Sequence, residues 1–176
     1  SELTIGILGG GQLGSLLCLG AKNLNIKTVI YCDDKDAPAQ VHANDFIFGD
    51  YNDKEKIQYF IDKVDLVTYE FENIPFETLD LINQFKEVKP KPAINKIVQH
   101  RLYEKDFINK CNIGTTRYVS IKEKSDLNAN IKLIPGILKT CRLGYDGKGQ
   151  YKLNNPSDIE NLNIDFSQEY ILEKMI

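Results

Sequence analysis

The sequence predicts an α/β protein in which an open sheet of parallel strands is followed by a second, smaller α+β unit. Three observations indicate this. Strand-like and helix-like segments alternate over the first ninety or so residues, a glycine-rich turn separates the first strand from the first helix, and a second glycine-rich segment joins two later strands. Strands that alternate with helices imply a parallel sheet with right-handed crossovers.

The strands of the first unit are apolar runs bounded by turn residues. We expect them at residues 3–8, 27–32, 45–48 and 66–69. Continuous apolar runs are typical of parallel strands buried on both faces.

The helices of the first unit are predicted from apolar residues at helical spacing. The first and second helices would each have one apolar face, and the third would begin at Pro75. The expected inward residues are, in turn, Leu13, Leu16, Leu17, Gly20 and Leu24; Ile57, Phe60, Ile61 and Val64; and Phe76, Leu79 and Ile82.

The remainder predicts a connector and a second unit. A connector rich in proline and lysine spans 89–92, helices follow at 93–99 and 101–111, and strands are expected at 116–121, 136–140, 149–153 and 170–176. A short helix would begin at Pro156, with Ser157 and Glu160 as a capping box. The sequence therefore predicts a first domain at 1–92, a helical connector at 93–114 and the second unit at 115–176. The last part has too few apolar residues to close a core, so we expect the chain to stop within a domain.

The composition excludes several classes of protein. A net charge of −3 and a pI near 5.5 favour neither nucleic acid nor a membrane surface as a partner. No apolar run approaches the roughly 20 residues of a membrane span, and the early first strand predicts no signal peptide. The only two histidines, His42 and His100, exclude a histidine-rich metal site. Neither has a nearby partner in the sequence, so a surface or helix role is expected for each. The cysteines have no metal-binding or CxxC spacing and predict reduced core thiols in a cytoplasmic protein; they are Cys18, Cys32, Cys111 and Cys141.

The first glycine-rich turn predicts a phosphate site. Gly9, Gly11 and Gly14 satisfy G-x-G-x-x-G between a strand and a helix, where glycines admit a phosphate to the unpaired N–H groups of the helix N-terminus. Asp33 follows the second strand, where a dinucleotide-binding fold carries its ribose-binding acid. A nicotinamide-dependent oxidoreductase is therefore an alternative, and a tight turn needed only for packing is another.

The second glycine-rich segment, residues 143–150, separates these alternatives. A glycine hairpin can bring backbone N–H groups to a triphosphate, and Lys139 and Lys148 would offset the phosphate charge. A dinucleotide-binding oxidoreductase has no need of such a hairpin. The competing interpretation is a surface hairpin without a ligand.

A third cluster of polar residues occupies 69–75, at the carboxyl end of a predicted strand. Glu70, Glu72 and Asn73 lie where open parallel sheets bind ligands. Helix capping is the alternative, because Asn73 and the acidic residues precede the helix that begins at Pro75.

The three motifs together resemble a known family. The segments IGILGGGQLG at 5–14, YEFENIP at 69–75 and GYDGKGQ at 144–150 are similar, in the same order, to those of the 5-(carboxyamino)imidazole ribonucleotide synthases of the ATP-grasp superfamily. The resemblance covers the whole chain. It implies a Rossmann-like pre-ATP-grasp domain at 1–92, a helical connector at 93–114 and the truncated first lobe of an ATP-grasp domain at 115–176.

The resemblance also implies an activity. Members of the family are ligases of purine biosynthesis that use ATP and bicarbonate to carboxylate 5-aminoimidazole ribonucleotide, with ADP and phosphate as products. It implies ATP and Mg²⁺ as cofactors, metal ligands beyond residue 176, a homodimer when the protein is complete, and no activity for this chain alone. A nicotinamide-dependent oxidoreductase and a non-catalytic nucleotide-binding module remain the alternatives.

The resemblance assigns residues to two sites. For ATP it implies Arg101 and Lys139 as nucleotide contacts, the loop as a lid, and the last four residues as the segment whose backbone binds adenine. These ATP residues are Arg101, Lys139, Gly144, Tyr145, Asp146, Gly147, Lys148, Gly149, Gln150, Glu173, Lys174, Met175 and Ile176. For the ribonucleotide they are Gly11, Gln12, Leu13, Glu72, Asn73 and Tyr145. Ser15 departs from the family, which commonly has arginine there.

Overall fold

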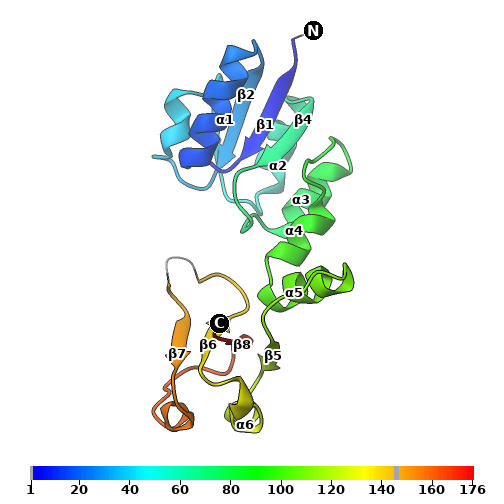
Figure 1. Cartoon of the computed structure of the whole chain (residues 1–176). Coiled ribbons are helices and arrows are strands. Elements are labelled where there is room, and N and C mark those ends of the chain that lie inside the picture. Colours follow the sequence, from blue (N-terminus) through cyan, green and yellow to red (C-terminus); the bar gives the residue numbers. More distant parts are fainter. Residues whose placement is uncertain (1, 145–146) are drawn as a thin grey trace. The chain divides into compact units, whose positions relative to one another are not determined.

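The computed structural model in Figure 1 describes residues 2–144 and 147–176 and divides into two compact units, Ser1–Lys96 and Ile97–Ile176. The division falls inside helix α4 (Pro92–Val98). Among the described residues no helix is long and apolar enough to cross a membrane.

The first unit contains the predicted parallel sheet. Its strand order is β3 (Asp45–Phe48), β2 (Lys27–Cys32), β1 (Thr4–Leu8) and β4 (Leu66–Tyr69), and every pairing is parallel. These strands confirm the predicted ones, with the first beginning one residue later. The expected connector is partly ordered, because the N–H of Lys89 donates to the carbonyl of Val67 beside a Val67–Val88 bridge.

Helices cover both faces of this sheet. On one face, α2 (Lys54–Asp62) and α3 (Phe76–Asn83) bury large side chains such as Phe60 and Leu79. On the other, α1 (Gln12–Asn23) and a short 3₁₀ helix, η1 (Pro38–Val41), bury mostly small residues such as Cys18 and Ala39. The predicted inward residues of α2 and α3 are confirmed as buried, except for Phe76, which is half-buried under the Lys96 ammonium.

The predicted apolar face of α1 is wrong. Leu13, Leu16, Leu17 and Leu24 are exposed, at 57, 56, 42 and 71%, and Gly20 has no neighbour that a side chain would meet. The buried residues are Gly14 and Cys18. The reason is the close approach of α1 to its neighbours: a Cβ at Gly14 would lie 3.0 Å from the carbonyl oxygen of Gly9. Only small side chains fit there, so the leucines point outward.

The second unit contains an antiparallel sheet in the order β5 (Tyr118–Ile121), β8 (Tyr170–Lys174), β6 (Gly136–Thr140) and β7 (Gln150–Leu153), preceded by α5 (Arg101–Lys110). It encloses a core of its own, contrary to the expectation from its composition. Three short elements contribute Leu127, Leu133 and Ile159 to this core. The sequence pattern did not predict two of them and predicted the third only in part. They are α6 (Lys124–Ala129), η2 (Ile131–Leu133) and η3 (Pro156–Ile159).

Two local predictions need correction. The capping box of η3 is formed by Asn155 and Asp158 rather than by Ser157 and Glu160, because Pro156 takes the first helical position and the residue before it becomes the cap. Of the four cysteines, all of them free, Cys111 is exposed and so is not a core thiol.

Candidate functional site

The first glycine-rich turn and the 69–75 motif lie side by side in the first unit. Strands β1 and β4 are paired with Leu8 opposite Tyr69, so the residues that follow them meet at the carboxyl edge of the sheet. The N–H of Gly11 donates to Glu70 Oε1 at 2.8 Å, and the N–H of Gly14 donates to Glu70 Oε2 at 2.7 Å. The N-terminus of α1 therefore holds an anionic group, which in this structure is the Glu70 carboxylate.

The glycines are needed for this close approach. A Cβ on Gly9, whose φ is +99°, would lie 2.4 Å from Glu70 Cγ, and one on Gly11 would lie 2.9 Å from Glu70 Oε1. Gln12 and Leu13 begin α1, where first-turn N–H groups have no helical acceptor. Glu72 and Asn73 continue the turn after Glu70 and are exposed and half-buried.

The sequence interpretation chose Glu72 and Asn73 for the substrate and gave Glu70 no specific role. One signal could have identified Glu70. Glu70 directly follows strand β4, and an α/β crossover places β4 beside β1. The residue after β4 therefore lies next to the glycine turn that follows β1.

In the second unit, one face of the sheet packs on the apolar core, and the other, which we call the polar face, carries charged side chains together with Ile137 and Ile171. Leu138 of β6 lies opposite Leu172 of β8, and both belong to the core. Because side chains alternate along a strand, the other face carries Lys139, which lies opposite Gln150 of β7. Glu173 of β8 belongs to this face too, as the diagonal neighbour of Lys139. Three of the residues predicted for ATP therefore share one polar face.

Glu173 forms two ion pairs on that face. Its Oε2 lies 2.6 Å from Lys139 Nζ, and its Oε1 lies 3.3 Å from Lys105 Nζ. Sequence reasoning missed Lys105. The available signal was its spacing, because Lys105 lies four residues after Arg101 on a predicted helix and so shares a helix face with it.

Arg101 is engaged with the base of the second glycine-rich segment. Its Nη1 donates to the carbonyls of Thr140 at 2.8 Å and Leu143 at 2.6 Å, and its Nη2 donates to that of Gly144 at 2.7 Å. Leu143 and Gly144 both have left-handed backbones, with φ of 57° and 72°. Guanidinium has five N–H donors, so these bonds leave two. Tyr145 and Asp146 lie outside the described residues.

Glycine is required elsewhere in this segment. Gly149 has a φ of +66°, and a Cβ there would lie 2.8 Å from Thr140 Oγ1. Gly147 also has a positive φ but meets nothing within 4 Å. Lys148 and Gln150 complete the described part of the predicted loop, and Gln150 begins β7.

The last residues have part of their backbone already bonded within the second unit. The N–H of Lys174 donates to the carbonyl of Arg117 at 2.8 Å, and its carbonyl accepts from Thr116 Oγ1 at 2.7 Å. The N–H of Met175 donates to the carbonyl of Pro135 at 3.0 Å. Ile176 follows and is fully exposed.

His100, expected to have a surface or helix role without a partner, is buried. Its Nε2 lies 2.7 Å from Glu169 Oε2, and its ring stacks on Tyr103 with the centroids 3.9 Å apart. The hydrogen bond from His100 lowers the pKa of Glu169. Burial raises the pKa of the nearby Cys141 thiol to about 11, which makes this thiol a poor nucleophile at neutral pH.

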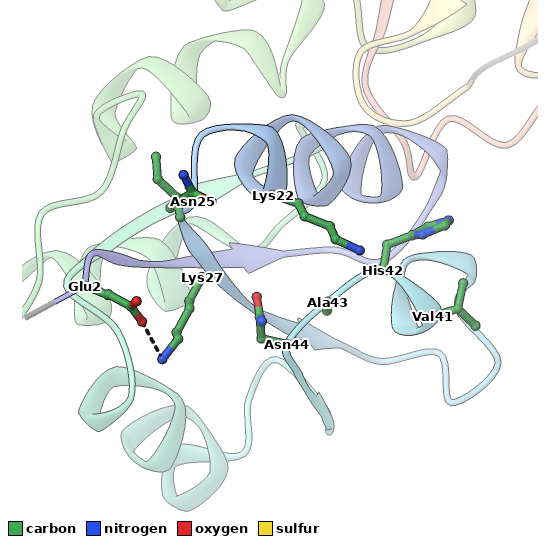
Figure 2. A pocket seen from close by; sticks show the side chains of 9 residues that line it. Glu2, Lys22, Asn25, Lys27, Val41, His42, Ala43 and Asn44 are labelled. Carbon is green, nitrogen blue, oxygen red and sulfur yellow. Dashed lines mark ion pairs between the residues drawn. The ribbon is translucent and has the colours of Figure 1, made fainter.

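A separate pocket of about 370 Å³ lies at the other end of the parallel strands (Figure 2). Lys22, at the end of α1, and Lys27, at the start of β2, line it, and Lys27 pairs with Glu2 at 2.7 Å. Ligands of open parallel sheets bind at the carboxyl ends of the strands, so this pocket is not part of the candidate site. Residues 2–144 and 147–176 hold no group of three or more histidine, cysteine or acidic side chains suited to a metal.

Two family models match this chain, one over most of each compact unit. The family model described as the ribonucleotide synthetase preATP-grasp domain matches residues 3–99. The chain belongs to this family. An ATP-grasp domain model matches residues 106–176 of this preATP-grasp family member. The predicted fold, a parallel-sheet domain followed by part of an ATP-grasp domain, is thereby confirmed.

Curated relatives of this preATP-grasp protein include a purine synthesis protein and N5-carboxyaminoimidazole ribonucleotide synthases. It is 41% identical to the bifunctional purine synthesis protein purC/E of Dictyostelium discoideum over 159 residues, which are 89% of this chain and 16% of that protein. It is 38% identical to the N5-carboxyaminoimidazole ribonucleotide synthase of Pseudomonas aeruginosa over 160 residues, which are 90% and 44% of the two chains. The resemblance drawn from the motifs is confirmed.

Two solved structures match over nearly the whole chain. An N5-carboxyaminoimidazole synthetase from Staphylococcus aureus complexed with ADP has a TM-score of 0.91 and 32% identity, covering 100% of this chain and 48% of that one. An ADP complex of another N5-carboxyaminoimidazole ribonucleotide synthetase has a TM-score of 0.93 and 34% identity, covering 99% and 47%. The chain thus spans less than half the length of the synthases it matches.

Proposed function

We propose that this chain is the N-terminal part of an N5-carboxyaminoimidazole ribonucleotide synthase, a cytoplasmic ligase of purine biosynthesis. It would help to carboxylate 5-aminoimidazole ribonucleotide with bicarbonate at the expense of ATP. One observation carries the proposal. Lys139, Gln150 and Glu173 share the polar face of the second sheet, within the segment that matches an ATP-grasp domain. A nicotinamide-dependent oxidoreductase would have no use for that face.

The reaction needs positioning and charge more than covalent catalysis. A bicarbonate oxygen attacks the γ-phosphorus of ATP, the bond to the ADP oxygen breaks, and carboxyphosphate forms. Carboxyphosphate releases phosphate and carbon dioxide, and the amine of the ribonucleotide attacks carbon dioxide and loses a proton to give the carbamate. Each stage places negative charge on oxygen atoms, which a lysine ammonium such as that of Lys139 stabilises.

The adenine would bind to the backbone at the end of β8. The N–H groups of Lys174 and Met175 already donate to Arg117 and Pro135, so the N–H of Ile176 is the donor left for a ring nitrogen. The Lys174 carbonyl, which accepts one bond from Thr116, keeps a second lone pair for the adenine amino group. The side chain of Glu173 lies on the polar face beside this segment.

The phosphates of ATP would meet Lys139 and the 144–150 loop, including Tyr145 and Asp146. Arg101 would contribute its two remaining N–H donors while it holds the base of that loop. Bound Mg²⁺ would neutralise phosphate charge, and we expect its ligands beyond residue 176.

The ribonucleotide phosphate would bind at the first glycine-rich turn, against Gly11, Gln12 and Leu13, with Glu72 and Asn73 toward the imidazole. The observation that supports this is the Glu70 carboxylate, which already satisfies the N–H groups of Gly11 and Gly14. A phosphate would take over such donors or use the neighbouring first-turn N–H groups. The assignment of 1–92, 93–114 and 115–176 as separate parts, and a homodimer, remain predictions.

Ligand-dependent melting of the complete protein tests the function. We expect ATP with Mg²⁺ and 5-aminoimidazole ribonucleotide each to raise the melting temperature, and NAD⁺ to leave it unchanged. Stabilisation by NAD⁺ alone would contradict the proposal. Stabilisation by ATP without any phosphate release when ribonucleotide and bicarbonate are added would instead favour a non-catalytic nucleotide-binding module.

Titration calorimetry with 5-aminoimidazole ribonucleotide tests the position of its phosphate. In Gly11→Val the added side chain would begin 2.9 Å from Glu70 Oε1, where donors and anion now meet, so we expect ribonucleotide binding to be lost. The control is Asp33→Ala, which removes the acid that a dinucleotide would need and should leave this affinity unchanged. Normal affinity in a folded Gly11→Val protein would remove the phosphate from this turn.

A further inference from the structure

Three charged side chains from three elements of the second unit form a compact cluster. Lys105 comes from α5, Lys139 from β6 and Glu173 from β8. Their side chains are 18, 22 and 10% exposed, so all three are largely removed from water. We call this group the 105–139–173 cluster.

The cluster carries one positive charge in excess, because two ammonium groups share a single carboxylate. The two lysines are not held equally. Lys105 Nζ also lies 5.8 Å from the centroid of the Tyr118 ring, within cation–π range. Tyr118 is directly opposite Glu173 in the sheet, so Lys105 is anchored between two adjacent strands while Lys139 has the shorter bond to Glu173.

A nucleotide phosphate bound at Lys139 would compete with Glu173 for its ammonium group. If Lys139 turned toward a phosphate and nothing else neutralised Glu173, a largely buried carboxylate would be left without a partner beside an anionic ligand. Leaving such a charge unpaired is unfavourable. Glu173 can release Lys139 only when another cation stays with it.

We propose that Lys105 is a positioning residue for nucleotide binding: it keeps Glu173 paired, so that Lys139 can leave Glu173 and reach a phosphate of ATP. The inference rests on the proposed function, because it takes ATP as the ligand of Lys139. Lys105 itself need not touch the nucleotide. Its contribution disappears when Glu173 no longer carries a charge that needs a partner.

Titration calorimetry with ATP and Mg²⁺ on the complete protein tests this dependence. Lys105→Met should weaken ATP binding by about tenfold or more, the effect of losing one charge-assisted contact. The double variant Lys105→Met/Glu173→Gln should bind ATP at least about threefold more tightly than Lys105→Met, because Lys139 is then free of a competing carboxylate. Lys105→Arg, which keeps the charge, should bind ATP more tightly than Lys105→Met as well. The matched control is Lys110→Met, an exposed lysine in the last turn of the same helix.

The outcomes separate this inference from the proposed function. If the wild type binds no ATP, the proposed function fails. If the wild type binds and Lys105→Met binds equally well, the positioning role is overturned. It is overturned too if the double variant is as weak as Lys105→Met, since Lys105 would then act by direct contact or by supporting the fold. Circular dichroism checks folding, and Lys105→Gln replaces Lys105→Met, with the same expectations, should the latter not fold.

Discussion

Each unit contains a carboxylate that occupies the groups predicted to bind a ligand anion, and the two cases differ in what would have to move. In the first unit, Glu70 accepts hydrogen bonds from backbone N–H groups fixed at a helix terminus, so a ligand phosphate that used these donors would displace the carboxylate. In the second, Glu173 accepts two lysine ammonium groups on flexible stems, so a lysine would move and the carboxylate would stay. Where the donors are fixed backbone N–H groups, as around Glu70, the carboxylate must move to admit a ligand. Where the donors are flexible lysine side chains, as around Glu173, the carboxylate can stay in place.

The largest effect should come from the mobile donor. Lys139→Met removes the cation that would move from Glu173 to the phosphates, and kcat/KM for ATP in the complete enzyme should fall at least tenfold, with a loss of about 1.5–3 kcal/mol for one charge-assisted contact. Steady-state kinetics measure it. Lys124→Met, on an exposed lysine of α6, is the control. If Lys139→Met had wild-type kinetics, Lys139 would not contact the phosphates, and its pairing with Glu173 would have only a structural role.

A medium effect is expected for the internal anion of the first unit. Glu70→Gln keeps the shape but loses the charge at the α1 terminus and replaces one acceptor oxygen by an NH₂ group. We expect the free energy of unfolding to fall by about 1–2 kcal/mol, measured by urea denaturation. Glu55→Gln, on an exposed carboxylate in the first turn of α2, should change it by less than about 0.5 kcal/mol. Equal effects would show that the two N–H bonds add nothing to a general helix-dipole effect.

The smallest effect concerns a third carboxylate, Glu169, which is 53% exposed and paired with the buried His100. Because this pairing lowers the pKa of Glu169 below 4.5, it stabilises the folded state above pH 4.5 and the stabilisation is lost as the pH falls through the lowered value. After discounting for solvent screening, we expect about 0.5 kcal/mol. Urea denaturation of Glu169→Gln at several pH values would measure it.

The wild type and Glu169→Gln should therefore differ in stability at neutral pH and converge below pH 4.5. Glu160→Gln, on an exposed carboxylate after η3, should differ little from the wild type throughout. A stability difference for Glu169→Gln that stayed constant down to low pH would show that the pair acts by packing rather than by charge.

Local pattern predicted the strands well but not which helix face is buried. The runs that became β1, β2, β3 and β4 are apolar because both sheet faces are covered, and that property is visible residue by residue. The orientation of α1 was not visible. Four leucines outnumber one glycine and one cysteine in any hydrophobicity pattern, yet the small residues are buried because of the distance between α1 and its neighbours.

The sequence predicted the motifs of the candidate site but not which of their side chains contact one another. The glycine-rich turns could be read from the sequence because backbone conformation restricts them to glycine. That Glu70 meets Gly11, or that Lys105 meets Glu173, depends on contacts across 59 residues and across elements whose register only the fold determines. Short elements such as α6 were missed because a polar sequence with a single buried leucine carries no periodic signal.

The left-handed Leu143 has one more consequence. A leucine in this conformation is unfavourable by roughly 1–2 kcal/mol, and Arg101 holds it there through the carbonyls of residues 140, 143 and 144 rather than through side chains. The shape of the loop base therefore depends on an arginine outside the loop as well as on Gly144 within it. An asparagine or glycine at position 143 would adopt the left-handed conformation with less strain than leucine.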